Sequence, residues 1–354
     1  MSDKDRTVPD YRALGQRLIR GGAVERRALE RELQSVAIDL MFGAEPAALI
    51  ERLIRLGAPP EEARRIIETA DRDPLIANGR EMALVLRRRD WLLGAMERQQ
   101  ALWPEAGMIE RRSGLRGEQF LERYYSRGRP VILAGEMRDW PAFRMWTPQF
   151  LALTIGGFEI EYHSENNRGR AGDPRRRMPF DAFVRMISRP DGGEGGYMLA
   201  DDASQNVAVA AWLNSDLGSL GAYLDRDAPG SGGTMWIGSP GVLTPLHHDL
   251  ANCLIAQVAG RNRFKIIAAG DIARVYNHQH SFSEIRDLEA PEFDPARYPA
   301  LAGARIHDVT LEPGEILFVP LAWWYQVRSS GFGASVTYTN FRWPNDSYRS
   351  YPGR

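Results

Sequence analysis

The sequence of 354 residues predicts a mainly β domain of the sandwich or small-barrel class, preceded by an all-helical region. Up to about residue 100, apolar side chains recur at the spacing of helices. From residue 233 onward, short runs rich in β-branched and aromatic residues alternate with turn residues. The run 104–107 between them has the composition of a linker. We therefore expect a helical region over residues 1–105 and a β domain over residues 106–354.

The N-terminal region shows four stretches of helical periodicity, at residues 23–41, 47–56, 61–69 and about 74–102. Pro60 suits the first turn of the third helix, and Gly43 suits the end of the first. The region contains neither an internal repeat nor a cluster of catalytic residue types. We interpret it as a cap, as a dimerisation element that would make a homodimer, or as a module that binds a partner.

In the β domain, short helices are expected at 118–125 and 150–153, and early strands at 130–133 and 158–162. Later strands are expected at 235–237, 251–258, 263–267, 304–311, 316–319, 324–328 and 333–340. The arginine-rich run 166–177 is interpreted as a solvated loop or, beside an active site, as a recognition element for an acidic substrate.

Composition argues against several classes of protein. The net charge of −1 gives no reason to expect a nucleic-acid partner. No apolar run reaches the ~18 residues that a membrane span needs, and residues 1–9 lack the apolar core of a signal peptide. Cys253 is the only cysteine, so an intrachain disulfide is impossible and a reducing compartment, the cytoplasm, is expected.

A candidate metal site lies in the run from Thr244 to Asp249. Side chains alternate between the faces of a strand, so His247 and Asp249 point the same way and His248 points away. Two histidines and one carboxylate on one face of a metal are typical of non-haem Fe(II) oxygenases. A hydrogen-bonded pair without a metal is the alternative. Cys253 shares the inward parity, and we interpret it as a buried, inert thiol that faces the pocket.

Several motifs follow one another between about residues 110 and 344. They are Arg-Pro-Val-Ile-Leu at 129–133, Asp-Trp-Pro at 139–141, the segment 244–260, Pro-Gly-Glu at 313–315, Leu-Phe-Val-Pro at 317–320, Trp-Trp at 323–324 and Asn-Phe at 340–341. Together they resemble the JmjC oxygenases, in particular the cupin-like proteins related to the asparaginyl hydroxylase that inhibits hypoxia-inducible factor. The resemblance implies a double-stranded β-helix, or jelly roll, that holds Fe(II) and 2-oxoglutarate at the mouth of the barrel.

The resemblance also assigns roles to single residues. His247 and Asp249 match the first two metal ligands of the family. Thr244 matches a hydroxyl that helps to hold the 2-oxoglutarate carboxylate, and Asn340 matches a pocket asparagine near the metal. Trp323 and its neighbour are interpreted as core and pocket wall.

Three positions depart from the family pattern. Tyr325 follows the Trp-Trp pair, where the family has its distal histidine ligand. Asn262 stands where the family has the lysine that binds 2-oxoglutarate. Met198, with Tyr197 beside it, matches on a looser alignment a tyrosine of the pocket.

Tyr325 would alter the metal site in one of two ways. A phenol, with a pKa of about 10, binds a metal well only after losing its proton, and it is then an anionic oxygen ligand. Otherwise it stays protonated and the metal keeps two protein ligands. Candidate replacement ligands are His278, His280 and His307, although each is more often a structural or surface histidine.

Asn262 can donate a hydrogen bond but carries no charge, so we expect 2-oxoglutarate binding to weaken by roughly 1–3 kcal/mol. Arg263 and Lys265 do not replace the lysine, because odd spacing on a strand places them on the opposite face. Arg342, in the loop after Asn340, is the candidate that would compensate.

Three functions remain open from the sequence. The first is an active oxygenase that hydroxylates a peptide, a protein side chain or a small molecule, with iron held by His247, Asp249 and Tyr325. The second is a pseudo-oxygenase that keeps the pocket for binding a partner. The third is a metal-dependent enzyme that does not use 2-oxoglutarate, because a fold alone does not determine a function.

Overall fold

The computed structural model describes residues 35–102, 107–164, 175–188, 195–290 and 293–352. Contacts divide the chain into two compact units, separated between Leu92 and Leu93, and each unit is considered by itself. Most of the expected linker and part of the arginine-rich run 166–177 lie outside the described residues. The boundary near residue 105 therefore stays a prediction. No helix in the described part of the chain is long and apolar enough to cross a membrane.

The first unit is helical over its described residues. Residues 35–41 form a helix, and three helices follow it, α3 (Pro46–Arg55), α4 (Pro60–Asp71) and α5 (Pro74–Gln100), the last of which continues past the division. Each of these three begins at a proline, whose fixed φ and missing N–H suit the first helical turn. Leu40, Leu49, Leu53 and Ile67 are buried together and form the core of the unit. The part of the expected first helix before residue 35 lies outside the described residues.

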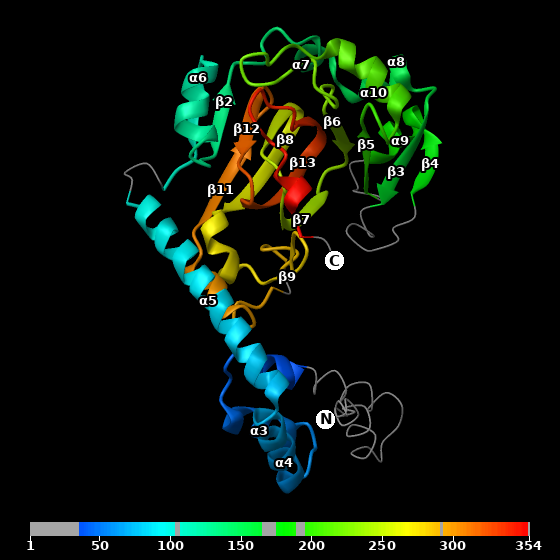
Figure 1. The fold of residues 1–354 in the computed structure, drawn as a ribbon. Coiled ribbons are helices and arrows are strands. Elements are labelled where there is room, and N and C mark those ends of the chain that lie inside the picture. Colours follow the sequence, from blue (N-terminus) through cyan, green and yellow to red (C-terminus); the bar gives the residue numbers. More distant parts are fainter. Residues whose placement is uncertain (1–34, 103–106, 165–174, 189–194, 291–292, 353–354) are drawn as a thin grey trace, which may run out of the picture. The chain divides into compact units, whose positions relative to one another are not determined.

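The second unit is mainly β (Figure 1). Its strands are β1 (Glu110–Ser113), β2 (Val131–Ala134), β3 (Glu159–Ser164), β4 (Arg176–Pro179), β5 (Gly196–Ala200), β6 (Thr234–Gly238), β7 (Leu243–His248), β8 (Cys253–Ile267), β9 (Asn277–Gln279), β10 (Phe282–Ser283), β11 (Ile306–Leu311), β12 (Glu315–Val319) and β13 (Trp324–Tyr338). Its α-helices, after the end of α5, are α6 (Gly117–Phe120), α7 (Pro141–Met145), α8 (Pro148–Ile155), α9 (Phe180–Ile187) and α10 (Val207–Leu213).

Strands β8 and β13 organise this unit, because each of them belongs to two sheets. They pair with each other along nearly their whole length in antiparallel register. One half of β8 pairs with β12 and the other half with β11, while one half of β13 pairs with β6 and the other half with β7. One sheet therefore runs β1-β2-β12-β8-β13-β6-β5-β3-β4, and the other contains β11, β8, β13, β7, β10 and β9. This is the jelly roll that the sequence predicts.

The two long strands differ from the sequence-based expectation, which split each of them into two. The sequence-based expectation leaves a gap between residues 258 and 263, but Gly260 sits inside β8 with φ +68°, a conformation that glycine adopts without steric cost. In β13 the irregularity is absorbed by a bulge between Ser330 and Ala334, so pairing with β8 continues past it. Local turn signals inside a long strand can thus mark a bend rather than an end.

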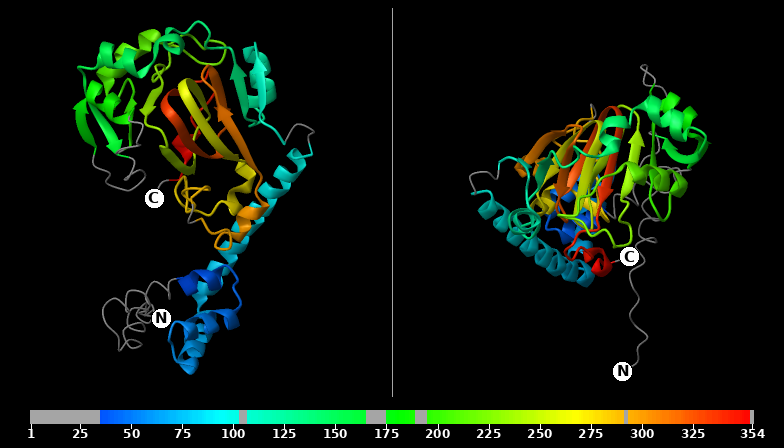
Figure 2. Two further views of the ribbon diagram at one scale, coloured as in Figure 1. Left: turned by 180° about the vertical axis from the view of Figure 1, so that it is seen from behind. Right: turned by 90° about the horizontal axis from the view of Figure 1, so that it is seen from above.

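Helices α8, α9 and α10 and strands β3 to β5, drawn in green, lie to one side of the yellow, orange and red strands in Figures 1 and 2. Their buried residues, including Leu151, Phe183 and Leu213, share one hydrophobic core with Phe318 and Val336 of the central strands. A separate buried cluster contains Cys253, Phe264 and Ile266 together with Tyr325 of β13.

Candidate metal and cosubstrate site

Strand β7 brings the proposed metal ligands together. His247 lies in β7, where it stands opposite Tyr325 of β13 on one side and Phe282 of β10 on the other. Asp249 follows directly after the last residue of the strand. The Nε2 atom of His247 and an Oδ1 oxygen of Asp249 are 3.9 Å apart. A pair of donor atoms at this separation can bind the same ion.

The ring of His247 is held in one orientation. Its Nδ1 lies 2.7 Å from the carbonyl oxygen of Pro245, which can only accept, so Nδ1 carries the proton of a neutral ring. The lone pair of Nε2 then faces Asp249, and this is how metal-binding histidines are usually oriented. His248 takes the opposite face, as alternation predicts, and its ring packs edge-on against Trp324 at 4.7 Å.

Tyr325 approaches the same carboxylate as a hydrogen-bond donor. Its hydroxyl donates to Oδ2 of Asp249 at 2.6 Å, and its ring centroid is 4.3 Å from that of His247. Burial, and then the nearby charge of Asp249, hold the pKa of the Tyr325 phenol well above its ordinary value. The thiol of Cys253 lies 3.7 Å from the same oxygen, and burial likewise raises its pKa. Both groups therefore face Asp249 as neutral donors.

A cavity of about 650 Å³ opens beside this pair. Its lining includes seven of the residues singled out from the sequence: Tyr197, Thr244, His247, Asp249, Asn262, Tyr325 and Asn340. These side chains come from distant segments that the two sheets bring into one space. The volume is typical of small-molecule pockets.

Four other predicted pocket residues are not part of this lining. Met198 is fully buried in the main core, because its strand turns that side chain away from the cavity. Cys253 lies behind Asp249. The indole nitrogen of Trp323 donates to the carbonyl oxygen of Gly128, which directs that ring elsewhere. Arg342 donates to the carbonyl oxygen of Gly221 at 3.3 Å, so it does not supply the cavity with a charge.

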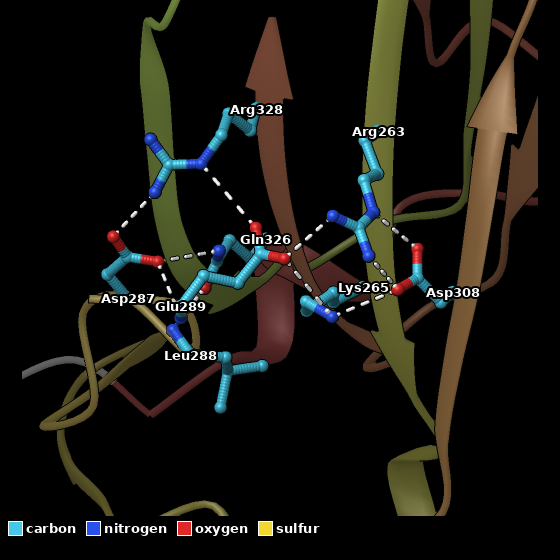
Figure 3. Close-up of polar contacts among 8 residues, drawn as sticks. All are labelled: Arg263, Lys265, Asp287, Leu288, Glu289, Asp308, Gln326 and Arg328. Carbon is cyan, nitrogen blue, oxygen red and sulfur yellow. Dashed lines mark hydrogen bonds and ion pairs between the residues drawn. The ribbon is translucent and has the colours of Figure 1, made fainter. Parts of the chain in front are cut away.

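The lining contains no lysine or arginine among the described residues. Asn262 is 8% exposed, and its Oδ1 accepts no hydrogen bond from the residues that the structure describes. The neighbouring cations lie on the opposite face of β8, where Arg263 and Lys265 both pair with Asp308 (Figure 3). The far carboxylate of 2-oxoglutarate therefore finds no described counter-charge in this cavity, and that cosubstrate does not fit it fully.

A metal ion finds two protein ligands among the described residues of this site. Within the described residues no three histidine, cysteine, aspartate or glutamate side chains gather as a metal site, so His247 and Asp249 stand as a pair. His307 packs near Trp323 and His280 near Tyr351, and neither lines the cavity. The side chain of the third candidate replacement, at position 278, lies outside the described residues.

Sequence reasoning missed several residues of the cavity wall. Phe264 could have been found, because it shares the parity of Asn262 on β8. Trp236 and Ser329 come from strands β6 and β13, and no local signal marks them. Asn345 braces the loop after Asp249 by accepting hydrogen bonds from the backbone and side chain of Asn252.

The class of the protein follows from this fold and from comparison with known families. A family model described as "Cupin-like domain" matches residues 117–347, which is well over half of the chain. The chain therefore belongs to the cupin-like JmjC family of Fe(II)- and 2-oxoglutarate-dependent oxygenases.

Similar proteins carry several different names. Jumonji C domain-containing protein 5 of Drosophila melanogaster is 26% identical over 236 residues, which cover 62% of this chain and 57% of that protein. Lysine-specific demethylase JMJ30 of Arabidopsis thaliana is 25% identical over 256 residues, 68% of this chain and 56% of that protein. tRNA wybutosine-synthesizing protein 5 of Homo sapiens is 26% identical over 257 residues, 68% and 80% of the two chains. The chain thus spans little more than half the length of the first two relatives.

Proposed function

We propose that this protein is an iron-dependent oxygenase of the JmjC type that hydroxylates a peptide, a protein side chain, an RNA or a small molecule. The observation that carries the proposal is the paired orientation of His247 and Asp249, whose donor atoms face each other beside the cavity. A bound ferrous ion would supply the site at which dioxygen is activated. The names of the relatives include lysine demethylases and a tRNA-modifying protein, so the near-neutral charge of the chain carries little weight against nucleic acid.

In this proposal Tyr325 serves as a hydrogen-bond donor rather than as a metal ligand. Its 2.6 Å bond engages one oxygen of Asp249, which leaves the other oxygen free to face His247. The bond also fixes the rotation of the carboxylate, as outer partners of metal ligands do. The pseudo-oxygenase is the second candidate, and the missing cation at Asn262 is the observation that favours it. An enzyme that uses the metal without 2-oxoglutarate is the third.

Metal binding tests the proposal. Wild type should bind Fe(II) or Mn(II), and His247→Ala should weaken this binding at least ~100-fold, because one of two protein ligands is lost. His248→Gln is the matched control, because the neighbouring ring points away from the site. Anaerobic iron titration and elemental analysis measure both. Equal iron content in wild type and His247→Ala would refute the assignment.

The role of Tyr325 is tested separately. Tyr325→His should tighten iron binding by adding a third protein ligand, whereas Tyr325→Phe should keep iron binding within about tenfold of wild type. A complete loss of iron in Tyr325→Phe would show that the phenol oxygen is itself a ligand.

A further inference from the structure

The charges of the cavity are unevenly distributed. Among the described lining residues, Asp249 is the only one with a charged side chain, and it belongs to the proposed metal site. The rest of the wall consists of aromatic, aliphatic, hydroxyl and amide side chains, including Trp236, Phe264, Ser329 and Asn262. The part of the cavity that lies away from the proposed metal site is therefore uncharged and mixes apolar with neutral polar side chains.

Asn262 lies in that uncharged part. It stands on β8 between Leu311 of β11 and Ser329 of β13, whose side chain also lines the cavity. Ser329 is four residues from Tyr325 along β13, a distance of ~13 Å on a strand. A ligand that binds the metal can thus extend along the strand toward the asparagine.

The amide of Asn262 is buried and incompletely paired. Its Oδ1 accepts no hydrogen bond within the described structure, although buried polar atoms in proteins are nearly always paired. A side-chain amide offers both donors and an acceptor, and exchanging its oxygen and nitrogen changes nothing in that respect. A ligand group that both donates and accepts, such as a primary amide or an alcohol, satisfies it completely.

A carboxylate satisfies it poorly. Ionised carboxylates only accept, so one would leave Oδ1 of Asn262 without a donor and would place like partial charges together. A buried carboxylate also needs a counter-charge to offset its lost hydration. Arg263 and Lys265 cannot provide one, because their charged ends pair with Asp308 and Glu289 on the other face of the strand (Figure 3).

We propose that the cavity selects a metal-chelating ligand whose far end, beside Asn262, is an uncharged amide or alcohol rather than a carboxylate. The inference rests on the proposed function, because it takes the near end of the ligand to bind the metal held by His247 and Asp249. It makes Asn262 a specificity-determining residue. A 2-oxo acid with a neutral far end is the corresponding class of cosubstrate.

The test uses two stable chelators that differ only at the far end. N-oxalylglycine ends in a carboxylate, and N-oxalylglycinamide ends in a primary amide. Each is titrated calorimetrically, without oxygen, into wild-type protein loaded with Mn(II). The amide should bind about tenfold more tightly, which corresponds to one additional hydrogen bond. Equal or tighter binding of the carboxylate would overturn the inference.

Two variants at position 262 connect the preference to this residue. Asn262→Leu keeps the branched shape of the side chain and should reduce the preference for the amide, because it removes the hydrogen-bonding contribution and leaves only the missing counter-charge. Asn262→Lys should reverse it in favour of the carboxylate, because the ammonium group would supply the missing counter-charge. A preference for the amide that persists unchanged in Asn262→Leu would contradict the assignment, and this variant buries no charge that could unfold the protein.

The outcomes also separate this inference from the function on which it rests. Mn(II) binding is read independently, from the electron paramagnetic resonance signal of free Mn(II). If the metal binds and neither chelator does, the inference fails and the metal site stands. If the metal does not bind, the proposed oxygenase and this inference fail together.

Discussion

The inner and outer faces of β8 and β13 share one backbone and differ in charge. On the outer face, Arg263, Lys265 and Arg328 meet three carboxylates in one connected network (Figure 3). On the inner face, Asn262 and Phe264 and their neighbours on β13 contribute no charge to the cavity. Alternation along a strand thus separates charged from neutral side chains within two residues. A strand rich in basic residues can therefore still present a neutral pocket.

The outer network also acts on the metal strand. Gln326, 1% exposed, accepts from the backbone N–H of Leu288 at 2.7 Å and donates to Asp287 at 2.9 Å. Asp287 in turn pairs with Arg328 at 2.6 Å. The segment held in this way bonds to β7, where the backbone N–H of Leu246 donates to the carbonyl oxygen of Arg286. The charged face therefore secures the edge of the strand that carries His247.

The largest effect is expected when a charge is moved to the neutral face. Phe264 is fully buried, so Phe264→Lys places an ammonium group there without a partner. The free energy of unfolding should fall by ~3–5 kcal/mol in urea denaturation. Arg261→Lys, on the exposed face of the same strand, is the matched control and should change it by less than ~0.5 kcal/mol. A loss below ~1 kcal/mol in Phe264→Lys would mean that the inner face tolerates charge.

Replacing Gln326, the buried amide on the charged face, should have an intermediate effect on stability. Gln326→Leu keeps the volume but leaves the N–H of Leu288 unpaired and Asp287 with one donor fewer. We expect a loss of ~1–3 kcal/mol in unfolding free energy and faster hydrogen exchange at Leu288. Arg261→Gln, which removes an exposed ion pair, should cost less than ~1 kcal/mol. Unchanged exchange at Leu288 would show that the segment is held by other contacts.

The smallest effect on stability is expected from the partly exposed ion pairs of Asp308, and it depends on pH. Hydrogen bonding from Arg263 lowers the pKa of Asp308 to about 2 in the folded protein, below its ordinary value of 3.8. This carboxylate therefore contributes stability above about pH 4, and the contribution disappears as the pH falls toward 2. Because Asp308 is partly exposed, the contribution at pH 7 should stay below ~1 kcal/mol.

Comparing wild type with Asp308→Asn by denaturation at pH 7 and pH 3 checks this. The difference in unfolding free energy between wild type and Asp308→Asn should be smaller at pH 3 than at pH 7, and smaller in high salt than in low salt. A constant difference at both pH values would mean that Asp308 acts through packing instead of charge.

The alternation of side chains along a strand predicted which residues of β8 share a face. It placed Arg263 and Lys265 away from Asn262, and the structure confirms that placement. It could not show what the charged side chains meet, because Asp287 and Glu289 come from an irregular loop. The unpaired Oδ1 of Asn262 was equally hidden, since it depends on how closely three strands pack around one amide.

The sequence also could not predict the direction of side chains outside regular strands. Arg342 was expected to compensate for the missing lysine, but the chain after β13 directs its guanidinium to Gly221. Tyr325 stands opposite His247 across β7 and β13, yet its hydrogen bond to Asp249 could be found only in three dimensions. The ligand set itself stays a prediction until metal binding is measured.

The position of β13 in the chain has a consequence for biosynthesis. Strand β7 leaves the ribosome well before β13, yet β13 is the long partner of both β7 and β8. Until residues 324–338 have been translated, the two earlier strands present unpaired edges, and Asp249 lacks its bond from Tyr325. Such distant pairings form slowly and leave nascent chains prone to aggregation. A growing polypeptide therefore cannot complete the hydrogen bonding around Asp249 before β13 has been made.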